Sequence, residues 1–254
     1  MREHGVELVE PPASGRRYGI TRRVHLNDTD AQGVLRIDAL AQFLQDVATD
    51  DVCDAGRAYG RGVWVLRRID VVVARCPVLY DTVTLLTFCS GTGPAWAERR
   101  TRVTDAAGEV LAEAVAVWVY VDRARGRPTA LDEEFAEWYG EAAAGRRVSA
   151  RLHLSGPAGD TASREWSVRE SDFDVLDHVN NVRSFEAMTD EFARRVPGRR
   201  VEHATLEYRG TLERGDTVEL RSRLGSDGEV LDVWLLVAGD VRVSARLVAG
   251  VPLH

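Results

Sequence analysis

Residues 27–48 read NDTDAQGVLRIDALAQFLQDVA, an Asp-rich turn that runs directly into an amphipathic segment. After the turn, apolar side chains recur at the spacing of one face of an α-helix. These side chains are Leu40, Phe43, Leu44, Val47 and Ala48. The spacing predicts a helix over roughly residues 37–55, with Gly56 near its C-terminus.

Strand patterns lie on both sides of this predicted helix. A short strand-like segment precedes the turn, and four longer runs of alternating polarity follow the helix. The predicted strands cover residues 17–26, 63–74, 82–89, 95–104 and 109–121. Turn-forming residues separate the four later runs, as is typical of an antiparallel meander. The last run places Ala112, Ala114 and Ala116 on one face, which leaves room for a helix to lie across the sheet.

The same order of elements returns in the second half of the chain. Residues 171–177 read SDFDVLD, and the segment after them has apolar residues at helical spacing as far as Pro197-Gly198. The helix-facing residues are Val182, Phe185, Met188 and Phe192, and the predicted strands cover residues 165–169, 201–208, 217–224, 230–238 and 241–248. Asp28 and Asp30 match Asp172 and Asp174 at an offset of 144 residues, which indicates a duplicated domain.

We therefore predict two domains of one kind, joined by a connector. The first covers residues 15–125 and the second residues 164–254. The connector, residues 126–163, contains a short helical pattern near residues 131–144. In each half a long helix follows one short strand and is then wrapped by a sheet, which is the hotdog arrangement. The expected fold class is α+β, as a tandem (double) hotdog.

Composition narrows the possible functions. The chain has 254 residues, 44% of them hydrophobic, which is enough for a substantial core. A formal charge of −7 argues against a nucleic-acid partner, because duplex affinity comes mainly from neutralising phosphates. The three cysteines lack the paired spacing of a zinc site or a disulfide framework, so we expect reduced, mostly buried thiols and no metal.

No early stretch of the sequence has the pattern of a secretory signal. No apolar stretch approaches the roughly 20 residues that a membrane-spanning helix needs. We therefore expect a cytoplasmic protein without a membrane span.

Motifs along the chain resemble one enzyme family. Asp172-Phe173-Asp174 followed by His178-Val179-Asn180-Asn181 resembles the D-x-D…H-V-N-N motif of hotdog thioesterases. The whole chain resembles the acyl-acyl carrier protein thioesterases, which carry two hotdog units in one polypeptide. Further matching segments are residues 43–48, 64–69 with Cys76-Pro77, 118–122 with Arg127-Pro128, and 206–209.

The resemblance implies hydrolysis of the thioester that joins a fatty acyl chain to acyl carrier protein, or to coenzyme A, without a cofactor. Asp174 and His178 match the catalytic Asp and His of the family. A thioester carbonyl needs a base or nucleophile and donors for the oxyanion. We predict that Val179, Asn180 and Asn181 bind substrate, with free N–H groups at the start of the helix as oxyanion donors.

The first half keeps only part of this pattern. Asp30 corresponds to Asp174, and Asp30 and Gly33 are predicted to contact substrate, either in a weak site or in an acyl-binding wall, whereas Val34 occupies the position that corresponds to His178. We therefore place the chemistry in the second half and expect the first half to form an acyl-binding wall. Trp64 and Trp118 are expected in its core, and Asp46 is kept as an outside candidate for a catalytic carboxylate.

The chain also departs from the family at two catalytic positions. Leu176 stands where the plant-type members carry an Asn, and Thr211 stands where they carry a Glu. Glu207 and Glu213 share the predicted strand face of Thr211 and are candidates to replace it.

Two other functions remain open from the sequence. One is a hydratase or dehydratase acting on acyl thioesters, and the other is a non-catalytic acyl-thioester binding protein. Two fused hotdog units satisfy the pairing that single units obtain by dimerising, so a monomer and a homodimer are both permitted.

Overall fold

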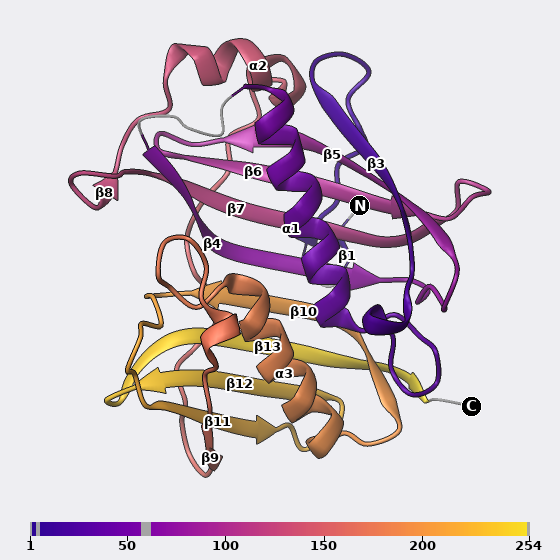
Figure 1. The fold of residues 1–254 in the computed structure, drawn as a ribbon, viewed down its shortest axis with the longest axis vertical. Helices are drawn as coiled ribbons and strands as arrows, with labels where there is room; N and C mark the ends of the chain where they lie inside the picture. Colours follow the sequence, from indigo (N-terminus) through magenta and orange to yellow (C-terminus); the bar gives the residue numbers. More distant parts are fainter. Residues whose placement is uncertain (1, 4–5, 57–61, 253–254) are drawn as a thin grey trace. The chain divides into compact units, whose positions relative to one another are not determined.

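The protein is described by a computed structural model that covers residues 2–3, 6–56 and 62–252. The chain divides into two compact units, Met1–Arg151 and Leu152–His254. In each unit one long helix accompanies an antiparallel sheet (Figure 1). The tandem hotdog predicted from the sequence is confirmed.

The first unit contains a five-stranded antiparallel sheet and two helices. Its strands are in the order β3-β5-β6-β7-β4, and the short β8 pairs with β7. The strands are β3 (Arg17–Arg23), β4 (Gly62–Val73), β5 (Thr82–Thr92), β6 (Trp96–Thr104), β7 (Val110–Asp122) and β8 (Arg127–Pro128), beside the separate pair β1 (Arg2–Glu3) and β2 (Val6–Glu7). The helices are α1 (Ile37–Asp54) and α2 (Glu133–Ala143).

Helix α1 lies across the sheet of the first unit, as the run of small residues in β7 predicted (Figure 1). Its apolar face is buried, with Phe43 and Val47 almost inaccessible to solvent. Ala114 and Ala116 of β7 are also buried. Burial of such side chains stabilises the unit by about 25 cal/mol for each Å² of apolar surface removed from water.

A network of buried ion pairs also stabilises the first unit. Arg100 is 1% exposed and its Nη2 lies 2.6 Å from Glu113 Oε2, while Arg102 Nε lies 2.7 Å from the other oxygen of Glu113. Glu98 pairs with Arg146 Nη1 at 2.6 Å. Charges removed from water need such partners, because an unpaired buried charge costs several kcal/mol.

The second unit repeats the first in topology. Its strand order is β10-β13-β12-β11-β9, so β9, β11, β12, β13 and β10 correspond in turn to β3, β5, β6, β7 and β4. The elements are β9 (Ala162–Trp166), α3 (Asn181–Arg195), β10 (Arg199–Tyr208), β11 (Val218–Leu224), β12 (Val230–Val237) and β13 (Asp240–Pro252). All four apolar residues predicted to face the core from α3 are buried.

Part of the predicted connector, residues 126–163, packs on the first unit. Residues 126–151 fold with the first unit, because α2 lies against β5 and buries Phe135 and Tyr139. Their spacing of four residues places both on one face of the helix. The bounds of the two domains and of the connector stay predictions.

The turn before each long helix has the same hydrogen bonds in both units. Asp28 Oδ2 accepts from the N–H of His25 (2.8 Å), and Asp172 Oδ2 accepts from the N–H of Arg169 (2.7 Å). The carbonyl groups of the same two aspartates accept from the residues that precede the helices, Arg36 (2.9 Å) and Asn180 (2.8 Å). One aspartate thus joins the incoming strand to the start of the helix in each unit.

We expect the change Asp172→Ala to lower the free energy of unfolding by about 1–3 kcal/mol, since it removes a buried carboxylate that accepts from the N–H of Arg169 and pairs with the Arg169 side chain. Asp28→Ala should have an effect of similar size in the first unit. Asp190→Ala is the control, because Asp190 is exposed on α3, and its effect should stay within about 0.5 kcal/mol. Urea denaturation measures all three, and unchanged unfolding of both turn variants would contradict this role.

Candidate active site

Asp174 lies in a tight turn between the short 3-10 helix η2 (Glu170–Asp172) and α3. Its N–H donates to the carbonyl of His178 (2.9 Å), and its own carbonyl accepts from Asp177 (3.0 Å). Oδ1 accepts from the N–H of Leu176 at 2.9 Å. Within the described part of the chain Oδ2 accepts no hydrogen bond, so one carboxylate oxygen of this partly exposed residue is available to a ligand.

His178 closes the same turn, and the structure brings it together with Asp174. Its carbonyl accepts a hydrogen bond from the N–H of Asp174, whereas its imidazole makes no hydrogen bond to any residue that the structure describes. The backbone of His178 forms an antiparallel bridge with Glu213, in the loop between β10 and β11. The corresponding bridge of the first unit joins Val34 and Val78.

The predicted oxyanion donors are only partly available. The N–H of Val179 donates to the carbonyl of Leu212 (2.9 Å), and the N–H of Asn180 donates to that of Asp172 (2.8 Å). The expectation of free amides is therefore wrong for Val179 and Asn180. The N–H of Asn181 has no acceptor among the described residues and remains a candidate donor.

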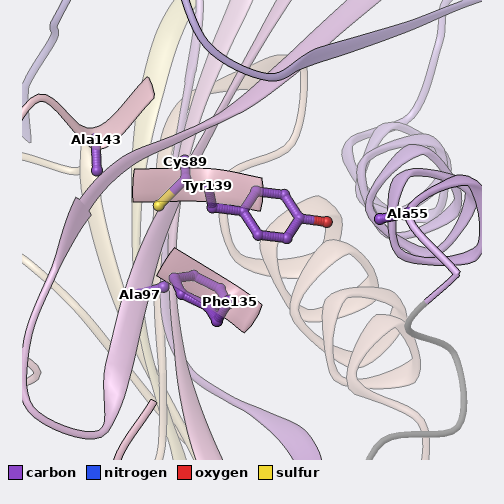
Figure 2. Close-up of a cluster of buried hydrophobic side chains, with 6 residues drawn as sticks. All are labelled: Ala55, Cys89, Ala97, Phe135, Tyr139 and Ala143. Atoms are coloured by element: carbon purple, nitrogen blue, oxygen red, sulfur yellow. The ribbon is translucent and has the colours of Figure 1, made fainter. Parts of the chain in front are cut away.

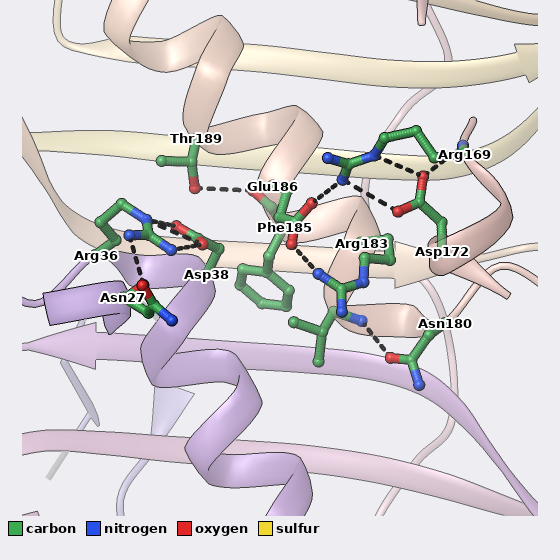
Figure 3. A network of polar contacts seen from close by, with 11 residues as sticks. Asn27, Arg36, Asp38, Arg169, Asp172, Asn180, Arg183, Phe185, Glu186 and Thr189 are labelled. Atoms are coloured by element: carbon green, nitrogen blue, oxygen red, sulfur yellow. Dashed lines mark hydrogen bonds and ion pairs between the residues drawn. The ribbon is translucent and has the colours of Figure 1, made fainter. Parts of the chain in front are cut away.

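The side chains around these amides hold the start of α3. Asn180 is the N-cap residue, and its Oδ1 accepts from the N–H of Val182 at 3.0 Å (Figure 3). Tyr208 donates its hydroxyl to the carbonyl of Asn181 at 3.0 Å. Burial raises the pKa of Tyr208, so the hydroxyl keeps the proton that it donates.

Arginine side chains surround the turn of the second unit. Arg169 pairs with both Asp172 and Glu186, and Glu186 also pairs with Arg183 (Figure 3). On the other side, Arg214 Nη2 lies 2.9 Å from Asp177 Oδ1, and its guanidinium group lies 4.2 Å from the centre of the Phe173 ring. These contacts fix the turn from outside and leave Asp174 unpaired with any described arginine.

The turn of the first unit places Asp30 and Gly33 in the corresponding positions. Asp30 Oδ1 accepts from the N–H groups of Gln32 and Val34, both at 2.9 Å. Gly33 has a φ of +75°, and Asp177 at the matching position has a φ of +59°. The turn requires this left-handed conformation, which glycine adopts without strain. Contact of Asp30 and Gly33 with substrate stays a prediction.

The departures from the family motif lie at the surface. Leu176 is 42% exposed and neighbours the fully exposed Val175, while Thr211 is also exposed. Of the two candidate carboxylates, Glu207 is fully buried and accepts from Leu154 N–H (3.1 Å) and Arg209 Nη2 (3.0 Å). Glu207 therefore anchors the segment that leads into the second unit, whereas Glu213 is exposed beside the turn.

The first unit has a partly open cavity of about 260 Å³, lined by residues of α1, α2 and the sheet. Its apolar wall comes from all three elements and includes Ala48, Val52, Trp64, Cys89, Ala97, Trp118 and Phe135. Figure 2 shows Phe135 and Tyr139 projecting from α2, with Cys89 and Ala97 of the sheet beside them. The cavity has room for an apolar chain. Trp64 and Trp118, expected in the core, line it.

One end of the cavity is polar. Asp51 of α1 is 1% exposed and receives Arg16 Nε and Arg99 Nη1, each at 2.7 Å. Arg99 and Tyr139 line the cavity. Burial, together with the nearby Asp51 carboxylate, raises the pKa of Tyr139, so its hydroxyl stays protonated.

Asp46, the additional candidate for a catalytic carboxylate, is held by two side chains of the first unit. It pairs with Arg22 and accepts from Gln42 Nε2 at 2.6 Å, on the first unit's long helix. The ion pair with Arg22 joins the helix to β3, whereas the Gln42 contact lies within the helix. In the described part of the chain, no three His, Cys, Asp or Glu side chains gather as they would around a metal ion.

Two copies of a long helix with an antiparallel sheet, one of which carries an Asp-His turn at the helix start, define a double hotdog protein. Residues 15–139 match the acyl-ACP thioesterase N-terminal domain and residues 156–242 match the acyl-ACP thioesterase C-terminal domain. The chain therefore belongs to the acyl-acyl carrier protein thioesterase family, whose members are thioester hydrolases.

Individual relatives agree with this membership. An uncharacterized protein of Mycobacterium tuberculosis is 27% identical over 247 residues, which covers 97% of each chain. A chloroplastic acyl-[acyl-carrier-protein] hydrolase of Cuphea viscosissima is 27% identical over 164 residues, 62% of this chain and 40% of that protein.

Solved structures show the same fold. A putative oleoyl thioesterase from Lactobacillus plantarum is similar with a TM-score of 0.85 and 20% identity, over 95% of this chain and 98% of that one. The 12:0-ACP thioesterase from Umbellularia californica gives a TM-score of 0.78 and 20% identity, over 94% and 99% of the two chains. None of the helices in the described ranges is long and apolar enough to cross a membrane.

Cysteine reactivity tests the packing of the cavity. Cys89 is buried, Cys76 is partly buried and Cys53 is exposed, so the expectation of mostly buried thiols holds only in part. Burial raises the pKa of Cys89 to about 11, so about one thiol in a thousand is ionised at pH 8. We expect iodoacetamide at pH 8 to modify Cys53 in the folded protein while Cys89 stays unmodified.

Peptide mass spectrometry would locate the alkylated residues. The protein unfolded in urea is the control, and all three cysteines should react there. Modification of Cys89 at the rate of Cys53 in the folded protein would contradict the burial of the Cys89 thiol.

Proposed function

We propose that the protein hydrolyses acyl-acyl carrier protein and releases a free fatty acid, with Asp174 as the base. The supporting observation is the turn that holds Asp174 and His178 together at the start of α3, in a member of this family. The carboxylate keeps one oxygen available, which a general base needs.

The reaction requires a water molecule and the thioester. Asp174 takes a proton from water as the water oxygen adds to the thioester carbonyl carbon. The tetrahedral intermediate then breaks its carbon–sulfur bond, which yields the carboxylic acid and the thiol of the phosphopantetheine arm after the proton is returned to sulfur. His178 orients the thioester through its unbound imidazole.

The oxyanion requires hydrogen-bond donors. We assign this role to the N–H of Asn181, which lies at the positive end of the helix dipole of α3. A preorganised donor of this kind contributes about a hundredfold to a thousandfold in kcat. Val179 and Asn180 support the role indirectly, since their hydrogen bonds hold the turn.

The acyl chain is assigned to the cavity of the first unit. Its largely apolar wall suits a hydrocarbon chain, and pockets for small ligands are commonly lined in this way. The second unit supplies the catalytic residues and the first unit supplies the binding surface. A cytoplasmic location, and the choice between monomer and homodimer, remain predictions from the sequence.

The change Asp174→Asn tests the base. The amide oxygen of Asn can still accept from the N–H of Leu176, so the turn should persist while the basic oxygen is lost. We expect kcat to fall by about a hundredfold to ten-thousandfold. Thiol release from acyl-acyl carrier protein, followed with a thiol reagent, measures the change.

Asp190→Asn on the exposed face of α3 is the matched control and should retain full turnover. Full activity of Asp174→Asn would refute the assignment. The same assay separates hydrolysis from the two alternatives, because a hydratase leaves the thioester intact and a binding protein releases no thiol.

The cavity is tested by the change Ala48→Leu, which adds three carbon atoms to its wall. We expect the preference in kcat/KM to shift about tenfold towards shorter acyl chains, as a small volume change in an apolar pocket allows. Ala136→Leu, on the exposed side of α2, adds the same volume outside the cavity and is the control. An unchanged chain-length profile for Ala48→Leu would contradict binding of the chain there.

A further inference from the structure

Glu213 is the residue opposite His178 across an antiparallel backbone bridge. Residues paired in this way carry their side chains on the same face, with Cβ atoms about 4.5–5.5 Å apart. The hydrogen bond from Val179 N–H to Leu212 carbonyl (2.9 Å) fixes this register. An imidazole and a carboxylate are thus placed as neighbours beside Asp174.

The first unit has the same backbone bridge, with apolar side chains in place of the imidazole and the carboxylate. Its bridge joins Val34 and Val78, and the hydrogen bond from Leu35 N–H to Pro77 carbonyl (2.9 Å) repeats the register. The fold itself therefore does not need charged side chains at the bridge. The His-Glu pair is specific to the unit that carries the chemistry.

Local contacts hold the Glu213 carboxylate. Thr211 donates its hydroxyl to Glu213 Oε1 at 3.1 Å, and the N–H of Glu213 donates to Asp216 Oδ2 at 2.8 Å. The neighbouring Arg214 is paired with Glu170 and Asp177. Among the described residues, no arginine forms an ion pair with Glu213, so its second oxygen is available to the imidazole.

We propose that Glu213 is the positioning residue of His178, a proposal that rests on the proposed function. The two side chains make no hydrogen bond to each other among the described residues; in the proposed reaction, rotation of either side chain lets the carboxylate accept from one ring nitrogen, which fixes the tautomer and the orientation of the ring. The other nitrogen then faces the thioester. The hydroxyl of Thr211 holds the other oxygen of the carboxylate in place.

The experiment is a double-mutant cycle of Glu213→Gln and His178→Asn, with acyl-acyl carrier protein as substrate and thiol release as readout. We expect Glu213→Gln to lower kcat by on the order of tenfold to a hundredfold with KM changed less than about threefold, as loss of an orienting partner does. In the His178→Asn background the same change should have no further effect, because the group that Glu213 positions is gone.

Glu219→Gln is the control, since Glu219 is a carboxylate of the same unit paired with Arg221. Melting temperatures establish that each variant is folded. Unchanged kcat in Glu213→Gln, or an equal loss with and without His178, would overturn the proposal while the proposed function stands. Absence of thiol release by the unaltered protein would instead refute the proposed function.

Discussion

The structure depends on one aspartate in each unit, Asp28 and Asp172. Its carboxylate accepts from the strand that enters the turn, and its carbonyl accepts from the residue before the long helix. A carboxylate that accepts a backbone N–H forms a stronger hydrogen bond than a neutral acceptor. Because this contact sets where the helix starts, it also sets which side chains of the turn face the solvent and which N–H groups remain free.

The two units use the same backbone for different purposes. At one pair of bridged positions, the first unit has Val34 and Val78 and the second has His178 and Glu213. The first unit instead has a partly open cavity that α2 helps to line. Under the proposed function, binding and chemistry fall to separate copies of one fold.

Much of the fold could be predicted from sequence, because helix faces and strand alternation follow directly from the spacing of apolar residues. The buried faces of α1 and α3 and the corresponding turns were predicted in this way. Which N–H groups are free could not be predicted from sequence. The N–H of Val179 donates to the carbonyl of Leu212, a residue that lies far along the chain, after α3 and β10. The cavity was missed for a related reason. Its wall joins α1, α2 and the strands, and only the spacing of Phe135 and Tyr139 hinted at α2.

The duplicated turn determines which positions of the protein can be substituted without loss of the fold. Its geometry is held mainly by main-chain atoms and a single aspartate, so the positions between the fixed points tolerate substitution at little cost to stability. The copy that carries Val34 and Val78 at the bridge has the same turn as the copy that carries His178 and Glu213. Two substitutions, at Val34 and Val78, would therefore place a polar pair at the bridge of the first unit without loss of its turn.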